Sequence, residues 1–279
     1  MGPAPILPLK RYQVFPKLFV PPQSGGMENL MLVVILAAFG VGGATMAGAL
    51  AGFLFKKIPS RFNNIILGFA AGVMLSASAF GLIQPALDGG GLFRAAIVTA
   101  GILAGAFFLN AVNRFVPCLE RFALGQSGIE QSQKLDSVML FVLAIAVHNL
   151  PEGIAAGVGF GTGNTADALA VVWGIALQNI PEGMVIIAPL LAAGTSRAKT
   201  LAIALFTGAV EVVGTLVGYL AIGLMREALP FALAFAGGTM LHVISDEMIP
   251  EIHEDGGDKS STYALLFGFC SMILISAVI

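Results

Sequence analysis

The chain has 279 residues, of which 57% are hydrophobic and only 11% are charged, and its mean hydropathy is +0.91. Soluble domains carry about 25% charged residues, so this composition excludes a soluble globular protein and indicates a polytopic membrane protein. The formal net charge of −2 gives no sign of a nucleic-acid-binding surface, and two cysteines, Cys118 and Cys270, are too few and too far apart for a disulfide framework.

The first 26 residues differ in composition from the rest of the chain. They contain six prolines and three basic residues, and they lack the long apolar stretch and small-residue cleavage site of a signal peptide. We interpret residues 1–27 as a disordered or non-native tail, with Met27 as the alternative start of the protein. Residues 28–279 are then expected to form one transmembrane transport domain.

Eight hydrophobic tracts follow, each long enough to cross a bilayer, because a membrane helix needs about 20 mostly apolar residues. In chain order they are Leu30–Phe55, Asn63–Leu87, Phe93–Phe115, Ser137–Gly159, Ala166–Ala192, Lys199–Met225, Pro230–Pro250 and Thr262–Ile279. Frequent glycine and alanine in these tracts predict close helix packing. The expected fold class is therefore all-α, with eight transmembrane helices.

Basic residues in the loops predict the orientation of the helices. One side holds or borders nine of them: Lys56, Lys57, Arg61, Arg114, Arg121, Lys134, Arg197, Lys199 and Lys259. The loops of the other side offer Arg94 and Arg226. The positive-inside rule places the richer side in the cytoplasm and both termini outward. The longest loop, residues 116–136, is interpreted as a flexible cytoplasmic connector.

A six-residue motif occurs twice, in the fourth and fifth tracts. The first copy is His148–Gly153 (HNLPEG), and the second, thirty residues later, is Gln178–Gly183 (QNIPEG). A glutamate inside a membrane helix is costly, so each copy marks a functional site. Positions three and four apart share a helix face, and the proline after each Asn-Leu or Asn-Ile pair removes a backbone hydrogen bond. We therefore expect two half-sites that meet at one buried centre.

A third carboxylate, Glu211, lies among apolar residues of the sixth tract. The three tracts together supply one imidazole, three carboxylates and three amides: His148, Asn149, Glu152, Gln178, Asn179, Glu182 and Glu211. An oxygen-rich set with one nitrogen suits Zn²⁺, Fe²⁺, Mn²⁺ or Cd²⁺ better than Cu⁺, and amide ligands suit a site that releases its ion. A pathway of protonated carboxylates is the physical alternative.

Two further regions are candidates for a route to and from this centre. A polar cluster at the end of the seventh tract is interpreted as an exit relay that passes metal to the cytosol; its members are His242, Asp246, Glu247, Glu251 and His253. The alternative for its outermost part is a solvated acidic loop. Toward the opposite side, Met74 and Ser78 are interpreted as an entrance lining, with core packing as the alternative for Met74.

The paired motif, with Glu211 downstream and Glu247 and Glu251 later, resembles the ZIP family of divalent metal transporters. The resemblance covers residues 28–279 and is greatest to the GufA-type branch, whose second motif begins with Gln. It implies a 3+2+3 arrangement of eight helices with inverted repeats, and a binuclear metal centre at mid-membrane. It also implies transport toward the cytosol by sliding of one helix group against another, and a homodimer.

The resemblance also implies which residues hold which ion. One metal would take His148, Glu152, Gln178 and Glu182; the other would take Asn149, Glu152, Asn179, Glu182 and Glu211, so that two glutamates bridge. Asn179 departs from relatives that carry Asp at this position. One fewer negative charge should weaken or retune the second metal position.

The functional hypothesis is an importer of divalent metal, with zinc as the leading substrate and cadmium, iron or manganese as further ones. The expected partners are these ions and the lipid bilayer, with no organic cofactor and no nucleic acid, and the compact loops favour a bacterial inner membrane. Two alternatives stay open: a proton-linked transporter of another cation, and an intramembrane zinc hydrolase. The hydrolase is disfavoured because no HExxH sequence is present and because amide ligands favour exchange over a durable site. The protein is therefore not expected to be an enzyme.

Overall fold

The computed structural model describes residues 27–54, 59–124, 146–192, 194–224, 226–253 and 259–279. Within these ranges the secondary structure is helical, without strands. Seven helical segments are long and apolar enough to cross a membrane: Asn29–Gly52, Arg61–Leu87, Leu92–Arg114, Thr165–Ala192, Arg197–Leu224, Leu229–His253 and Lys259–Val278. The prediction of an all-α polytopic membrane protein is confirmed.

The fourth predicted tract, Ser137–Gly159, is helical over residues 146–159, and the rest of it lies outside the described residues. The count of eight spans therefore stays a prediction. The predicted tail, residues 1–27, also lies outside them except for its last residue. The predicted connector, residues 116–136, begins as helix, because the third span continues through Leu124, and glycine follows it.

The helices follow one another along the chain with short interruptions. Their bounds are α1 Met27–Gly52, α2 Ser60–Ser76, η1 Ala77–Ile83, α3 Gln84–Leu87, α4 Leu92–Leu124, the unlabelled helix 146–159, η2 Phe160–Thr162, α6 Thr165–Val185, α7 Ile187–Ala192, α8 Arg197–Leu224, η3 Arg226–Ala228, α9 Leu229–Val243, η4 Ile244–Met248, α10 Ile249–His253 and α11 Lys259–Val278. The Asn164 side chain caps α6 by accepting a hydrogen bond from the Ala166 amide at 3.2 Å.

Two spans contain a wider, π-helical turn. The first, η1, comes just before Pro85, and the second, η4, comes just before Pro250. Proline has no N–H and its ring clashes with the carbonyl four residues earlier, so a local widening of the helix relieves the clash. In the second case the widened turn carries Asp246 and Glu247, two residues of the predicted exit relay.

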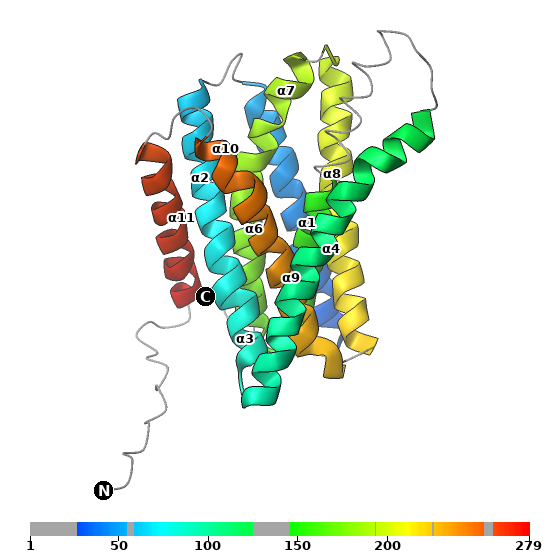
Figure 1. The fold of residues 1–279 in the computed structure, drawn as a ribbon, viewed down its shortest axis with the longest axis vertical. Coiled ribbons are helices and arrows are strands. Elements are labelled where there is room, and N and C mark those ends of the chain that lie inside the picture. Colours follow the sequence, from blue (N-terminus) through cyan, green and yellow to red (C-terminus); the bar gives the residue numbers. More distant parts are fainter. Residues whose placement is uncertain (1–26, 55–58, 125–145, 193, 225, 254–258) are drawn as a thin grey trace, which may run out of the picture.

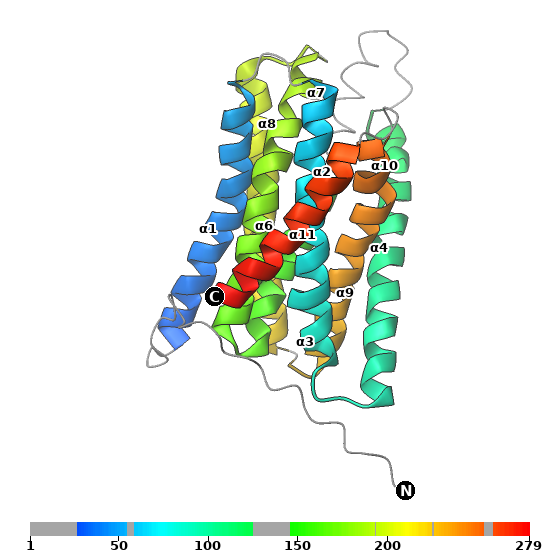
Figure 2. The same ribbon diagram turned by 90° about the vertical axis from the view of Figure 1, so that its left-hand side faces the viewer.

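The helices pack as two groups. The α1 group consists of α1, the helix 146–159, α6 and α8; the α2 group consists of α2 with η1 and α3, α4, α9 with η4 and α10, and α11. Figure 2 shows α1, α6 and α8 on the left and α2, α9 and α4 on the right, with α11 laid against α2. The groups meet where α6 faces α2 and η1.

The atoms that face the glycines differ between contacts within a helix group and a contact between the groups. Inside the α1 group, a Cβ on Gly153 would overlap the carbonyl oxygen of Glu211, and inside the α2 group, a Cβ on Gly72 would overlap that of Leu265. Backbones therefore touch directly within each group, as small residues allow. Between the groups, Gly81 of η1 faces the side chain of Val171 in α6 instead.

The outward faces of the bundle are apolar. Phe107, Trp173 and Phe267 expose 68%, 60% and 68% of their surfaces, as expected of side chains that face lipid. The helices α2, α8 and α11 all begin at the upper end of Figure 1, where α7 and α10 also lie. This upper end is the side with the predicted excess of Lys and Arg.

Candidate metal site

Side chains from three helices of the α1 group meet midway along the bundle. The Gln178 amide Nε2 donates to Glu152 Oε1 at 2.7 Å and joins α6 to the helix 146–159. The Asn179 Nδ2 donates to Glu211 Oε2 at 2.6 Å and joins α6 to α8. These contacts bring residues of both motif copies and Glu211 together. Glu152 is 2% exposed and Glu211 is completely buried.

Three hydrogen-bond donors converge on the Glu211 carboxylate. Its Oε1 accepts from the Thr45 hydroxyl at 2.6 Å and from the Asn149 amide, and its Oε2 accepts from Asn179. Thr45, in α1, is itself 3% exposed. The sequence analysis missed this residue, because a lone threonine in a membrane helix is usually satisfied by its own backbone.

Three acceptor oxygens at the same centre have no hydrogen-bond partner in the described part of the chain. They are Glu152 Oε2, Gln178 Oε1 and Asn179 Oδ1, all buried. A buried acceptor without a donor is costly, and a cation is a partner that satisfies several acceptors at once. With Glu182, which lines the adjoining cavity, these oxygens form a donor set for a hard or borderline divalent ion.

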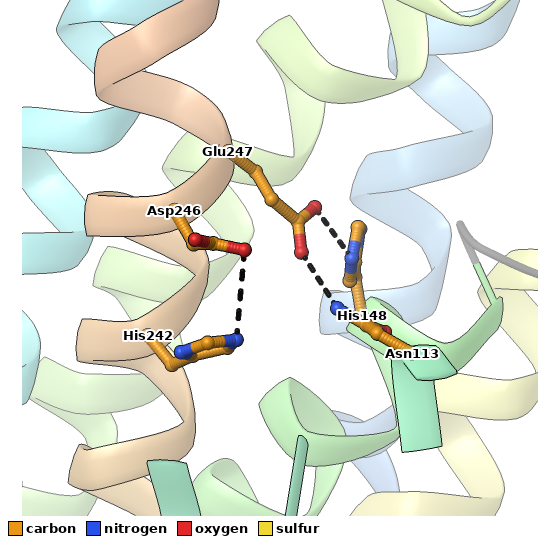
Figure 3. Close-up of polar contacts among 5 residues, drawn as sticks. All are labelled: Asn113, His148, His242, Asp246 and Glu247. Carbon is orange, nitrogen blue, oxygen red and sulfur yellow. Dashed lines mark hydrogen bonds and ion pairs between the residues drawn. The ribbon is translucent and has the colours of Figure 1, made fainter. Parts of the chain in front are cut away.

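His148, the one nitrogen ligand of the predicted set, points elsewhere. Its Nε2 lies 2.6 Å from Glu247 Oε2, on the α2 group, and Glu247 Oε1 accepts from the Asn113 amide of α4 at 3.1 Å. Figure 3 shows Glu247 held between Asn113 and His148. Among the described residues, accordingly, no three His, Cys, Asp or Glu side chains form a closed metal cluster. The polar groups that meet at the centre are therefore carboxylates and amides.

A cavity of about 300 Å³ connects the centre with the exit relay. Its polar lining is Thr45, His148, Asn149, Glu152, Glu182, Glu247 and Glu251. Two of the lining residues, Pro189 of α7 and Glu251 of α10, are exposed, so the cavity opens at the upper end of Figure 1. A larger cavity of about 1010 Å³ lies near the start of α1 and the end of α8, and its lining has no charged residue.

The other members of the predicted exit relay lie beside this cavity without lining it. His242 Nε2 is 3.8 Å from Asp246 Oδ2, and Asp246 is 66% exposed (Figure 3). The exposed His253 places its Nδ1 2.8 Å from the Ile249 carbonyl oxygen, one turn back in α10. Of the five relay residues, Glu247 and Glu251 therefore have the direct connection to the centre.

The predicted entrance residues are closed into the core. Met74 and Ser78 are completely buried, and the Ser78 hydroxyl donates to the Met74 carbonyl oxygen at 2.7 Å. Neither residue lines the cavity that reaches the centre. Around them lies a dense apolar core that includes Val41, Ala156 and Met240. Their role as an entrance stays a prediction.

The fold and the centre together define a class: a polytopic membrane protein with a buried, oxygen-rich polar centre. Comparison with known proteins shows that the chain belongs to the ZIP zinc transporter family, which matches residues 121–276. The zinc transporter GufA of Myxococcus xanthus is 38% identical over 247 residues, which cover 86% of this chain and 96% of that protein.

Other relatives agree with this assignment. The zinc transporter ZIPB of Bordetella bronchiseptica is 36% identical over 242 residues, which cover 85% of this chain and 78% of that protein. The zinc transporter ZIP11 of Homo sapiens is 29% identical over 326 residues, with 86% and 95% covered. The resemblance stated from the motif is confirmed. The family is one of transporters, so the prediction that the protein is not an enzyme is confirmed and the hydrolase alternative is wrong.

Proposed function

We propose that this transporter moves zinc into the cytosol through the centre formed by the two motif copies. The observation that carries the proposal is the set of three buried oxygens without donors. One of them belongs to Glu152, which lines an open cavity together with Glu182. Cadmium, iron and manganese have the same preference for such mixed ligands and are expected as further substrates.

The direction of transport is inferred from the two ends of the bundle. The cavity opens at the end where Arg197, Lys199 and Lys259 lie, which the positive-inside rule assigns to the cytosol. In the opposite half, Met74 and Met240 belong to a buried apolar core, and the larger cavity near the start of α1 and the end of α8 has no charged residue in its lining. We interpret this arrangement as the inward-facing state, in which an ion from outside has reached the centre and leaves toward the cytosol. Both termini then face outward.

The packing supports alternating access by sliding of the α1 group along the α2 group. All seven predicted ligands belong to the α1 group, so they would move together. Direct backbone contacts at glycines, such as Gly153 on Glu211, hold that group as one body. The contact of Gly81 with the Val171 side chain lies between the groups, where side chains repack more easily than backbones.

The ion would be released when His148 forms its contact with Glu247. His148 is the only imidazole of the predicted ligand set, and in the inward-facing state it pairs with Glu247. Because the Nε2 atom cannot bind a metal and pair with Glu247 at the same time, formation of this pair would release an ion held through Nε2 into the cavity. Glu251, farther along the cavity wall, would receive it next.

Three finer statements stay predictions. A binuclear centre would need Glu211 as a ligand of the second ion. A bacterial inner membrane agrees with relatives from Myxococcus and Bordetella, and a homodimer is expected from the family resemblance alone. Proton coupling is the remaining rival, since a carboxylate pathway can move protons as well as metal.

Zinc-dependent stabilisation separates the proposal from a transporter of another cation. Zinc should raise the melting temperature of the detergent-purified protein, because a ligand that binds the folded state stabilises it. Glu182→Gln should abolish the shift and Glu251→Gln, in the outer cavity wall, should keep it. An equal shift in wild type and Glu182→Gln would overturn the assignment of the centre, and no shift in wild type would overturn zinc as its substrate.

A further inference from the structure

The contacts of Glu211 point to the number of ions that the centre holds. We propose that this protein binds one divalent cation per chain, and that Glu211 is a positioning residue for two amides rather than a ligand of a second ion. The inference rests on the proposed zinc site and departs from the binuclear centre that the family resemblance implies. Three observations support it: the orientation of the Asn179 amide, the hydrogen-bond donors to the Glu211 carboxylate, and the buried oxygens without a donor.

The orientation of Asn179 is fixed by its neighbours. Its Nδ2 lies 2.6 Å from Glu211 Oε2 and 3.3 Å from the Val41 carbonyl oxygen. Both neighbours are acceptors, so only the NH₂ end of the amide fits between them. A cation placed there would face two N–H bonds. An aspartate at position 179 would instead place a second carboxylate beside Glu211, an arrangement that needs a cation between them.

The Glu211 carboxylate is satisfied from the protein itself. Thr45, Asn149 and Asn179 each donate a hydrogen bond to it. The backbone of Thr45 is packed closely against α6, because a Cβ on Gly183 would overlap the Thr45 carbonyl oxygen. These three donors occupy the place that a second ion would take.

The free oxygens belong to side chains other than Glu211. Glu152 Oε2, Gln178 Oε1 and Asn179 Oδ1 are the buried acceptors without a partner among the described residues, and Glu152 and Glu182 line the cavity. By holding the NH₂ of Asn179, Glu211 leaves the Oδ1 of that residue free for the ion. One cation completes this set, and His148 can join it when it leaves Glu247.

The test counts zinc per chain. Purified protein is loaded with excess zinc, desalted and analysed for zinc by inductively coupled plasma mass spectrometry, and the Glu152→Gln/Glu182→Gln double variant gives the background. Wild type should hold one zinc above that background and Glu211→Gln should also hold one. Asn179→Asp should hold two, and Asn179→Asp/Glu211→Gln should return to one.

The zinc counts of wild type and of Glu211→Gln decide between one bound ion, two bound ions and none. Two zinc ions in wild type, falling to one in Glu211→Gln, would overturn the inference while leaving the proposed zinc site intact. No zinc above background in folded wild type would overturn the site and the inference together. Gel filtration and metal-free melting of every variant establish that it is folded. If Asn179→Asp does not fold, the comparison of wild type with Glu211→Gln still decides between one ion and two.

Discussion

Glu247→Gln is predicted to tighten zinc binding and to slow transport, because Glu247 and the ion compete for His148. The His148 and Glu247 side chains are 23% and 28% exposed, so solvent partly screens their contact. A pair of this kind contributes about 1 kcal/mol. That bias leaves roughly 15% of molecules with His148 free, which weakens the apparent zinc affinity about sixfold. Removing the charge should therefore lower the Kd by up to about sixfold.

The assay has two parts. Zinc Kd is measured on detergent-purified protein by isothermal titration calorimetry, and the maximal uptake rate is measured in proteoliposomes. Asn113→Ala, which frees the other oxygen of Glu247, should change Kd in the same direction by less. Asp246→Asn is the matched control, because Asp246 is 66% exposed and pairs with His242 at 3.8 Å. Unchanged or weaker zinc binding by folded Glu247→Gln would refute the competition.

Two further predictions concern the helix groups. Gly153→Ala should prevent accumulation of folded protein, because its Cβ would overlap the Glu211 carbonyl oxygen. In the control Gly40→Ala, the added Cβ meets nothing within 4 Å, so this variant should express normally. Gel filtration of fluorescent fusions measures the folded protein of each variant. A disulfide between Gly81→Cys and Val171→Cys, on a background without the native cysteines, should stop uptake until it is reduced, and full uptake by the cross-linked protein would contradict sliding.

Much of the centre could be predicted from the sequence, and the reason is periodicity. Polar residues three and four apart in an apolar helix share one face, so Asn149 and Glu152, and likewise Gln178 and Glu182, had to point to a common centre. Glu211 followed from the cost of an isolated carboxylate in a membrane helix. The seven described spans lie at the predicted tracts because hydrophobic length alone determines them.

The features of the site that could not be predicted depend on contacts between segments that are distant in the sequence. Thr45 and Asn113 are single polar residues in their helices, and nothing in their local sequence indicates Glu211 or Glu247 as their partner. The contact of His148 with Glu247, on a helix distant in the sequence, likewise has no local signal. The π turns before Pro85 and Pro250 were also missed, because proline predicts a disturbance of the helix but not its form.

The central claim is tested most directly by uptake of radioactive zinc into proteoliposomes, with wild type beside the Glu152→Ala/Glu182→Ala double variant. Both glutamates line the cavity at the buried centre, so the account predicts saturable uptake by wild type and none by the folded double variant. Uptake by the double variant at the wild-type rate would contradict transport through this centre.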